Sequence, residues 1–212
     1  EGFKSLKGVI KGKSELYDYL RVREKLIFYN SDNTKQTNII GNYTNSFTYG
    51  TDINSDCFLV QGKSEEGVKI NYKNKTINSK IYGDYNFENI CSAIAIGDYF
   101  NIGFDNIKKG VEDYLPENNR SQVKNKGSNT IILDAYNANP TSMNLAIKSF
   151  EESYSENKII IVGDMFELGV ESHKYHQQTV MYLEKISKAE VFIVGLNFCK
   201  TKHSTKIKSF ES

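Results

Sequence analysis

The sequence predicts an α/β fold with a mainly parallel sheet in its later part, because strand-like and helix-like runs alternate there. Short β-branched runs lie at 130–134, 158–162 and 190–194, and amphipathic runs of helical period lie between them at 140–152 and 171–186. Consecutive strands separated by helices usually pair in parallel through right-handed crossovers. We therefore expect a βαβαβ unit, with a polar turn at the end of its first strand as the place for a ligand.

The charge balance argues against two classes of partner. The 212 residues contain 27 Lys and Arg against 26 Asp and Glu, which gives a net charge of +1. A basic patch for nucleic acid or for an anionic membrane does not follow from this balance, so we expect no nucleic-acid partner. The sequence has no apolar run long enough to span a bilayer, no signal peptide and no lipidation motif, so we expect no membrane insertion.

The cysteines favour a reducing compartment. Cys57, Cys91 and Cys199 are odd in number, far apart and without CxxC or Cys/His metal-ligand spacing. We therefore expect a cytoplasmic protein. The chain starts at Glu1 inside an amphipathic pattern and ends at Ser212 shortly after a strand, so we also expect it to be part of something longer.

The first helix is predicted over residues 5–20. Its apolar face contains Leu6, Val9, Ile10, Tyr17 and Leu20. Lys13 falls on the same face, where its aliphatic stem could lie along apolar surface while its amine reaches water. Alternatively, a partly buried amine has a lowered pKa and enough free base to react with carbon dioxide, and the resulting carbamate can bind a metal. The local sequence does not decide between these two interpretations.

A β-rich stretch follows and continues to about residue 82. Residues 25–29 are typical of a strand that runs into a turn at 30–33. Further strands are predicted in SFTYG (46–50), CFLVQGK (57–63), GVKINYK (67–73) and TINSKIY (76–82). A short Asn/Lys turn separates the last two runs, so we expect them to form a hairpin.

Two predicted helices complete this part of the chain. The helix over 86–100 is expected to bury Ile90, Cys91, Ile94 and Ala95. The helix over 104–115 is expected to begin at a capping Asp105 and to bury Ile107, Val111 and Leu115. After it, Pro116-Glu117-Asn118-Asn119 is the best candidate for a domain boundary. At the other end, the Lys/Ser-rich tail from Thr201 to Ser212 is expected to be a surface connector.

The polar turn between 134 and 139 is the strongest candidate for a ligand site. Asp134 stands at the carboxyl end of the strand 130–134, which we expect to be buried, and Tyr136, Asn137 and Asn139 follow it. Ligands of open α/β sheets bind at this place, and the next helix points free N–H groups toward them. The alternative is an ordinary turn in which Asn139 caps the helix and Pro140 takes its first position.

Other polar residues stand at the ends of predicted elements. Asn86 and Asn89 lie three apart at a helix start, where two amides suit a purine, although capping is the alternative. Arg120 follows the predicted boundary, where its guanidinium could bind phosphate oxygens, although a surface Arg is the commoner case. Asp164 and Glu167 are expected at the same sheet edge as Asp134.

Metal-binding and phosphate-loop motifs are weak or absent in the sequence. His173 and His176 lie three apart near a helix start and could bind a metal, but no third ligand lies nearby. The sequence contains no GxxxxGK[ST], no GxGxxG and no GxSxG. If the protein handles a nucleotide, the loop that binds its phosphates is therefore not in these residues.

Several motifs together resemble those of the Mur ligase family. DAYNANPTSMN (134–144) is followed by VGDMFELG (162–169) and ESHKYH (171–176), in the order and at the spacing of the family's pattern. GDYNFENICSAIA (83–95) is similar to the family's G-x-x-N-x-x-N-x-x-AA segment. The opening EGFKSLKGVIKGKSEL (1–16) is similar to the stretch that follows the family's metal-binding histidine.

The resemblance implies two incomplete domains of an ATP-dependent ligase. Residues 1–117 would be the later part of a central ATPase domain, and residues 118–212 most of a truncated, Rossmann-like C-terminal domain. The pairing of YNANP with GDMFELG favours the branch that adds D-Ala-D-Ala to UDP-MurNAc-tripeptide, with ATP and Mg²⁺, through an acyl phosphate. The family resemblance also implies a cytoplasmic enzyme, and we expect a monomer whose partners are these small-molecule substrates.

The resemblance also assigns roles to individual residues. Lys13 matches the lysine that becomes a carbamate and supports Mg²⁺, which favours the second interpretation above. Asn86 and Asn89 match residues on the adenine side of the nucleotide, Arg120 an arginine that reaches its phosphates, and Asp134 an aspartate that holds its ribose. Tyr136, Asn137 and Asn139 would line the site for ATP and the amino acid. His176 matches a family position to which we assign no function.

Important parts of the family's pattern are missing. The phosphate-binding loop, the catalytic glutamate, the metal-binding histidine and the domain for the uridine nucleotide would all precede Glu1. We therefore expect this chain by itself to be inactive. The alternatives are another Mur ligase, a folylpolyglutamate synthase, or a degenerate nucleotide-binding protein without catalysis.

Overall fold

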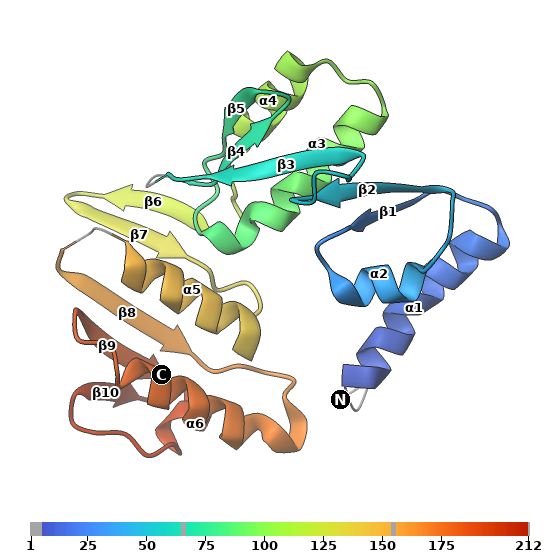
Figure 1. The fold of residues 1–212 in the computed structure, drawn as a ribbon. Helices are drawn as coiled ribbons and strands as arrows, with labels where there is room; N and C mark the ends of the chain where they lie inside the picture. Colours follow the sequence, from blue (N-terminus) through green and yellow to red (C-terminus); the bar gives the residue numbers. More distant parts are fainter. Residues whose placement is uncertain (1–5, 65–66, 154–155, 212) are drawn as a thin grey trace. The chain divides into compact units, whose positions relative to one another are not determined.

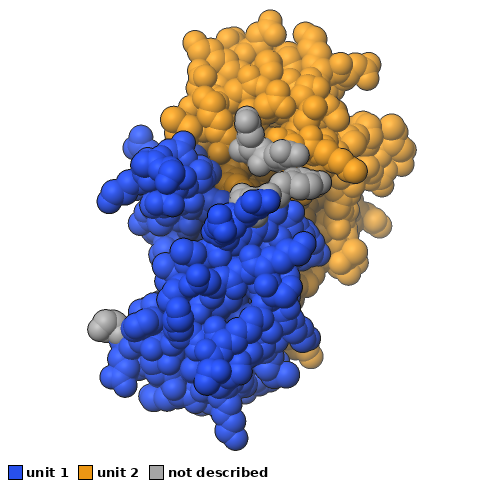
Figure 2. All heavy atoms as spheres, turned by 90° about the vertical axis from the view of Figure 1, so that its left-hand side faces the viewer, with its two compact units in different colours: residues 1, 116–212 blue, residues 2–115 orange. Residues whose placement is uncertain are grey.

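The structure, a computed structural model, describes residues 6–64, 67–153 and 156–211. The chain divides into two compact units, of which one extends to Leu115 and the other begins at Pro116. Figure 2 shows the two units in different colours. The division coincides with the first residue of the proline-containing stretch at 116–119.

The first unit contains a five-stranded sheet with the order β1-β2-β3-β4-β5. Its strands are β1 (Ile27–Asn30), β2 (Ser46–Gly50), β3 (Cys57–Gly62), β4 (Lys69–Tyr72) and β5 (Lys75–Asn78). The first three pair in parallel, and β3, β4 and β5 pair antiparallel. The predicted hairpin is confirmed, because Ile70 of β4 faces Ile77 of β5 across a turn at Lys73 and Asn74 with φ values of 48° and 60°.

Helices of the first unit are α1 (Leu6–Val22), α2 (Thr34–Ile40), α3 (Phe87–Tyr99) and α4 (Phe104–Asp113). Helix α3 packs against the three parallel strands (Figure 1), and all four residues predicted to be buried on it lie in the core. On α1 the side chains of Val9, Ile10, Tyr17 and Leu20 are half-buried, as expected, and that of Leu6 lies outside the described part.

The prediction of β-structure from residue 34 to 45 was wrong, because α2 lies there. The side chain of Asn33 caps this helix by accepting hydrogen bonds from the backbone N–H groups of Lys35 and Gln36. The prediction for α4 was partly wrong as well. Gly103 rather than Asp105 precedes its first turn, and Leu115 is 58% exposed because α4 ends two residues earlier, while Ile107 is buried as expected.

The second unit contains a three-stranded parallel sheet of order β10-β9-β8 and a separate two-stranded antiparallel sheet. Its elements are β6 (Gln122–Lys126), β7 (Asn129–Leu133), α5 (Pro140–Glu152), β8 (Lys158–Gly163), α6 (Ser172–Leu183), β9 (Ala189–Val194), α7 (Leu196–Cys199) and β10 (Ile207–Phe210). Residues of α5 and α6 share one hydrophobic core with the inward faces of the three parallel strands. The α/β class and the mainly parallel later part are therefore confirmed.

Two details of the predicted βαβαβ unit were wrong. Strand β7 pairs antiparallel with β6, and within the described residues it has no strand pairing with β8. Its first three residues are exposed and only Ile132 and Leu133 are half-buried, so it is not the buried strand that was expected. The third parallel strand is β10, which lies in the segment predicted to be a surface connector.

No described helix combines the length and the apolar character needed to cross a membrane.

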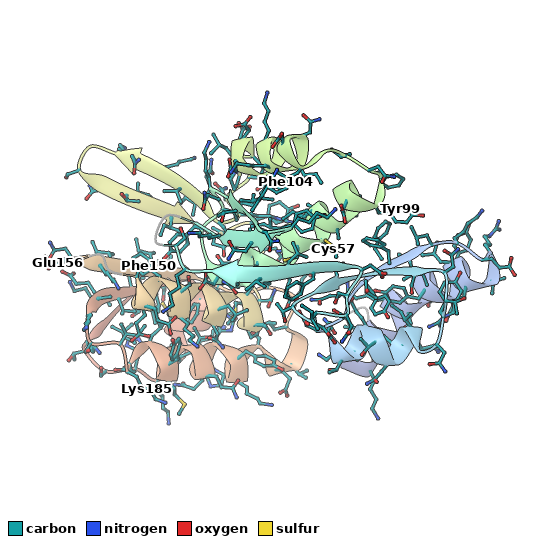
Figure 3. All side chains as sticks on the ribbon, turned by 45° about the horizontal axis from the view of Figure 1, so that its top comes forward. Cys57, Tyr99, Phe104, Phe150, Glu156 and Lys185 are labelled. Carbon is teal, nitrogen blue, oxygen red and sulfur yellow. The ribbon has the colours of Figure 1, made fainter. Side chains whose placement is uncertain are left out.

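Cys57 and Cys91 are both buried in the core of the first unit, where Cys57 lies on β3 (Figure 3). Burial raises the pKa of both thiols from the usual value of 9.0 to about 12. Between these values the thiols ionise in the unfolded chain and stay protonated in the folded chain. The free energy of unfolding should therefore fall as the pH rises from 9 to 12, by roughly 1 kcal/mol per pH unit for each thiol.

Urea unfolding followed at several pH values measures this dependence. A Cys57→Ala/Cys91→Ala double variant should show a shallower loss of stability above pH 9. The expectation is wrong if the variant and the unaltered chain have the same slope.

Candidate functional site

The turn after β7 is joined to the segment that precedes β6 by two hydrogen bonds. The N–H group of Ala135 donates to the carbonyl oxygen of Asn119 at 2.8 Å, and the N–H group of Ser121 donates to Oδ1 of Asp134 at 3.1 Å. Ser121 is buried, whereas Asp134 is exposed. The two bonds fix the residues on both sides of Arg120 against the end of the strand.

Arg120 lies over the aromatic face of Tyr136. The carbon atom of its guanidinium is 3.9 Å from the centroid of the ring, which is the geometry of a cation–π contact. Its neighbours Asn119 and Ser121 both have left-handed backbone conformations, with φ values of 55° and 49°. Such conformations are uncommon for residues other than glycine and often mark functional segments. The turn therefore combines a carboxylate, an oriented cation and an aromatic ring.

The start of α5 is closed by its own cap. Oδ1 of Asn139 accepts hydrogen bonds from the N–H groups of Thr141 and Ser142, and its backbone carbonyl accepts from Met143. Pro140 has no N–H group to offer. The capping interpretation is thus correct for Asn139, and the expectation of free N–H groups at this helix start was wrong. Ligand-binding groups at this turn must come from the other side chains.

Asp164, at the end of β8, is engaged inside the second unit. Its carboxylate accepts hydrogen bonds from the backbone N–H groups of Asn197 and Phe198 at 2.9 Å each, and so it caps α7 from a neighbouring strand. Gly195 lies beside it with a φ of 119°, and a Cβ atom there would lie 2.4 Å from the carboxylate carbon. Only glycine fits, because both the backbone conformation and the space exclude a side chain.

His176 is fully buried, and both of its ring nitrogens have partners. Nε2 accepts from the N–H group of Met165 at 3.0 Å, so Nδ1 bears the proton and donates to the carbonyl oxygen of Ser172 at 2.7 Å. The ring also packs edge-on against Phe198, with centroids 4.6 Å apart. His176 therefore fastens the loop after β8 to α6 and α7. This structural role excludes the predicted pair of His173 and His176 as a metal site in this arrangement.

The turns after β7 and β8 lie at the same end of the core. Ala138 of the first turn and Leu168 of the second both pack against the same buried cluster. Figure 1 shows that α5 and α6 begin from these two turns. Asp134 and Glu167 therefore lie at the same end of the second unit, but the expectation of a shared sheet edge was wrong, because in the described part of the chain β7 pairs with β6 and is not part of the sheet that contains β8. Glu167 is exposed and has a φ of 62°, whereas Asp164 is used internally.

In the first unit, Asn86 and Asn89 bond to each other at the start of α3. The amide nitrogen of Asn89 donates to Oδ1 of Asn86 at 3.2 Å, and the amide nitrogen of Asn86 donates to the carbonyl oxygen of Tyr82 at 2.8 Å. The side chain of Asn86 makes no capping hydrogen bond, although the residue occupies the cap position. The capping interpretation is therefore wrong for the side chain of Asn86. The side-chain amides of Asn86 and Asn89 instead form a hydrogen-bonded pair.

Lys13 is exposed on α1, so the partial burial that would favour a carbamate is not observed. Among the residues that the structure describes, no three His, Cys, Asp or Glu side chains converge on a point that could hold a metal ion.

Sequence reasoning missed the residues that organise the turn. Asn119 and Ser121 hold Arg120 through their own backbone carbonyl and N–H groups, which every residue other than proline has, so their residue types do not reveal this role. The contact of Arg120 with Tyr136 was also missed. Fifteen residues separate the two in the sequence, and they come together only because β6 and β7 pair between them, which was not predicted.

Comparison with known proteins gives consistent matches over both units. Residues 1–97 match the profile of the Mur ligase middle domain, and residues 119–209 match that of the Mur ligase glutamate ligase domain. The UDP-N-acetylmuramoyl-tripeptide–D-alanyl-D-alanine ligase of Bacillus subtilis is 33% identical over 199 residues, which are 90% of this chain and 42% of that protein. The chain thus spans less than half the length of this curated relative.

Two crystal structures share the fold. MurF from Acinetobacter baumannii superposes with a TM-score of 0.81 at 21% identity, over 99% of this chain and 47% of that one. The MurF ligase of Thermotoga maritima in complex with ADP gives a TM-score of 0.70 at 18% identity, over 88% of this chain and 44% of that one.

Replacing His176 by Ala should destabilise the second unit. The change leaves the buried N–H group of Met165 without its acceptor and opens a cavity beside Phe198, which together cost about 2–4 kcal/mol. His173→Ala is the matched control, because His173 is exposed on the same helix and should change stability by less than about 0.5 kcal/mol. Thermal unfolding monitored by circular dichroism compares the two variants, and equal melting temperatures would contradict the structural role.

Proposed function

The chain belongs to the Mur ligase family, and we propose that it forms part of an ATP-dependent ligase that joins D-Ala-D-Ala to UDP-N-acetylmuramoyl-tripeptide. The observation on which the proposal rests is the 33% identity with the Bacillus subtilis enzyme of that name over 90% of this chain. The match includes both units and therefore both groups of candidate residues. We place the reaction in the cytoplasm, in keeping with the free thiols of Cys57, Cys91 and Cys199. We also expect a monomer.

A ligase of this kind must first activate a carboxylate. A carboxylate is a poor electrophile, since an amine cannot displace oxide from it. Transfer of the terminal phosphoryl group of ATP to the carboxylate gives an acyl phosphate, and attack by the amine of D-Ala-D-Ala then forms the amide and releases phosphate. During the transfer, cations held close to the phosphoryl group stabilise its negative charge.

We assign the nucleotide contacts in the second unit to the turn after β7. Arg120 would bind phosphate oxygens through its fork of N–H donors, and Asp134 would accept hydrogen bonds from the ribose hydroxyls. Tyr136 and Asn137 would line the same site, because both are exposed next to these groups. Asn139 would support the turn by capping α5. The complex of the Thermotoga maritima enzyme with ADP supports nucleotide binding by this fold.

In the first unit we assign the adenine side to Asn86 and Asn89. Their mutual hydrogen bond orients both amides at the start of α3, where each can present a donor or an acceptor to a purine edge. Mg²⁺ would accompany ATP, and Lys13 would support it as a carbamate. This assignment rests on the match of residues 1–16 to the family's pattern and not on burial, since Lys13 is exposed.

The whole protein that contains this chain should release phosphate from ATP only when both UDP-MurNAc-tripeptide and D-Ala-D-Ala are present. The present chain of 212 residues should release none, because it lacks a GxxxxGK[ST] phosphate-binding motif. A coupled phosphate assay tests both statements. Phosphate release by the whole protein with a different amino acid in place of the dipeptide would reassign the substrate, and turnover by this chain alone would refute its expected inactivity.

Asp134→Ala in the whole protein should raise the KM for ATP. The loss of one charged hydrogen bond to ribose corresponds to about 1.5–3 kcal/mol, or about a tenfold to hundredfold change. Asp134→Asn is the matched control for the turn itself, since an amide oxygen can still accept from the N–H group of Ser121. If the KM for ATP is unchanged in Asp134→Ala, Asp134 does not bind the ribose and the assignment is wrong.

A further inference from the structure

We propose that Tyr136 is a positioning residue that holds the guanidinium of Arg120 in place for the phosphates of a nucleoside triphosphate. This inference rests on the function proposed above, and it names a role for the aromatic ring that is distinct from contact with the ligand. It begins from the stacking of the guanidinium carbon of Arg120 at 3.9 Å from the ring centroid of Tyr136.

Stacking of this kind fixes the plane of the guanidinium without using its donors. The five N–H groups of an arginine lie in the plane of the guanidinium and point outward from its rim, whereas the ring of Tyr136 contacts the face. Within the described part of the chain, Arg120 makes no hydrogen bond and no ion pair. The donors therefore stay available for the oxygens of a ligand.

The backbone holds Arg120 from the other side. Asn119 accepts a hydrogen bond from Ala135, and Ser121 donates one to Asp134, so both neighbours of Arg120 are attached to the end of β7. Both neighbours have left-handed conformations that an unconstrained chain would rarely adopt. Two hydrogen bonds therefore fix the backbone on either side of Arg120, and the ring of Tyr136 fixes its guanidinium. Together these contacts restrict the conformations of a side chain that is otherwise long and mobile.

Restricting the arginine in advance favours binding, because less conformational entropy is lost when the ligand arrives. The ring is suited to this task, since Tyr136 is 60% exposed and its face is held at the site by the turn and not by the core. The competing role for Tyr136 is a hydrogen bond from its hydroxyl group to the ligand. The two roles are separable, because phenylalanine retains the ring and lacks the hydroxyl.

The stack can be tested in the present chain without any ligand. In NMR spectra the side-chain protons of Arg120 should show upfield ring-current shifts. We expect Tyr136→Phe to keep these shifts and Tyr136→Leu to abolish them. Unshifted protons in the unaltered chain, or shifts that survive in Tyr136→Leu, would overturn the inference.

The functional consequence is tested in the whole ligase. Tyr136→Leu should weaken ATP binding about threefold to tenfold, and Tyr136→Phe, which keeps the ring, should weaken it less than Tyr136→Leu does. Arg120→Lys keeps the charge and loses the planar stack, so adding Tyr136→Leu to it should cause no further loss.

Equal impairment of ATP binding in the Phe and Leu variants would assign the role to the hydroxyl and overturn the proposal, and so would unimpaired binding in Tyr136→Leu. If the unaltered ligase releases no phosphate with both substrates, the proposed function fails instead. The NMR result in the present chain then still decides whether Tyr136 positions Arg120.

Discussion

Two hydrogen bonds, from the N–H group of Ala135 to the carbonyl oxygen of Asn119 and from the N–H group of Ser121 to the carboxylate of Asp134, hold the segment before β6 against the end of β7. Without them the segment before β6 would be an ordinary linker, and Arg120 would be one of many surface cations. With them, both neighbours of the arginine are attached to the end of β7, and its guanidinium lies over the ring of Tyr136. The β6–β7 hairpin thus brings residues that are distant in sequence into one polar group, to which we assign nucleotide binding.

The neighbouring loop after β8 shows the opposite use of polar residues. Asp164 and His176 lie where ligand contacts are expected from the sequence, yet their hydrogen bonds go to groups of the second unit itself, mainly backbone groups. They give the loop a fixed conformation and leave Glu167 at its surface. The presence of a polar residue in a motif therefore does not distinguish a residue that contacts a ligand from one that holds a loop.

Much of the fold followed from local patterns in the sequence. The 3.6-residue period of α3 and the Asn139-Pro140 start of α5 predicted those helices closely, because burial and capping act within a few residues. Local patterns failed where pairing partners decide the outcome. Strand β7 pairs with β6, and β10 pairs with β9 although it lies in a segment that was predicted to be a connector. Helix α2 was missed because seven residues are too few to show a helical period among the β-rich runs around them.

For the site, residue types indicated Asp134 and Arg120 as candidates. Their contacts depend on the β6–β7 hairpin and could not be derived from their spacing in the sequence.

The central claim is that this turn binds the ribose and phosphates of ATP in a Mur ligase. A crystal structure of the whole protein with a non-hydrolysable ATP analogue tests it most directly. We expect the carboxylate of Asp134 at hydrogen-bond distance from a ribose hydroxyl, and the guanidinium of Arg120 at hydrogen-bond distance from a phosphate oxygen while still stacked on Tyr136. A bound nucleotide that contacts neither side chain would contradict the account.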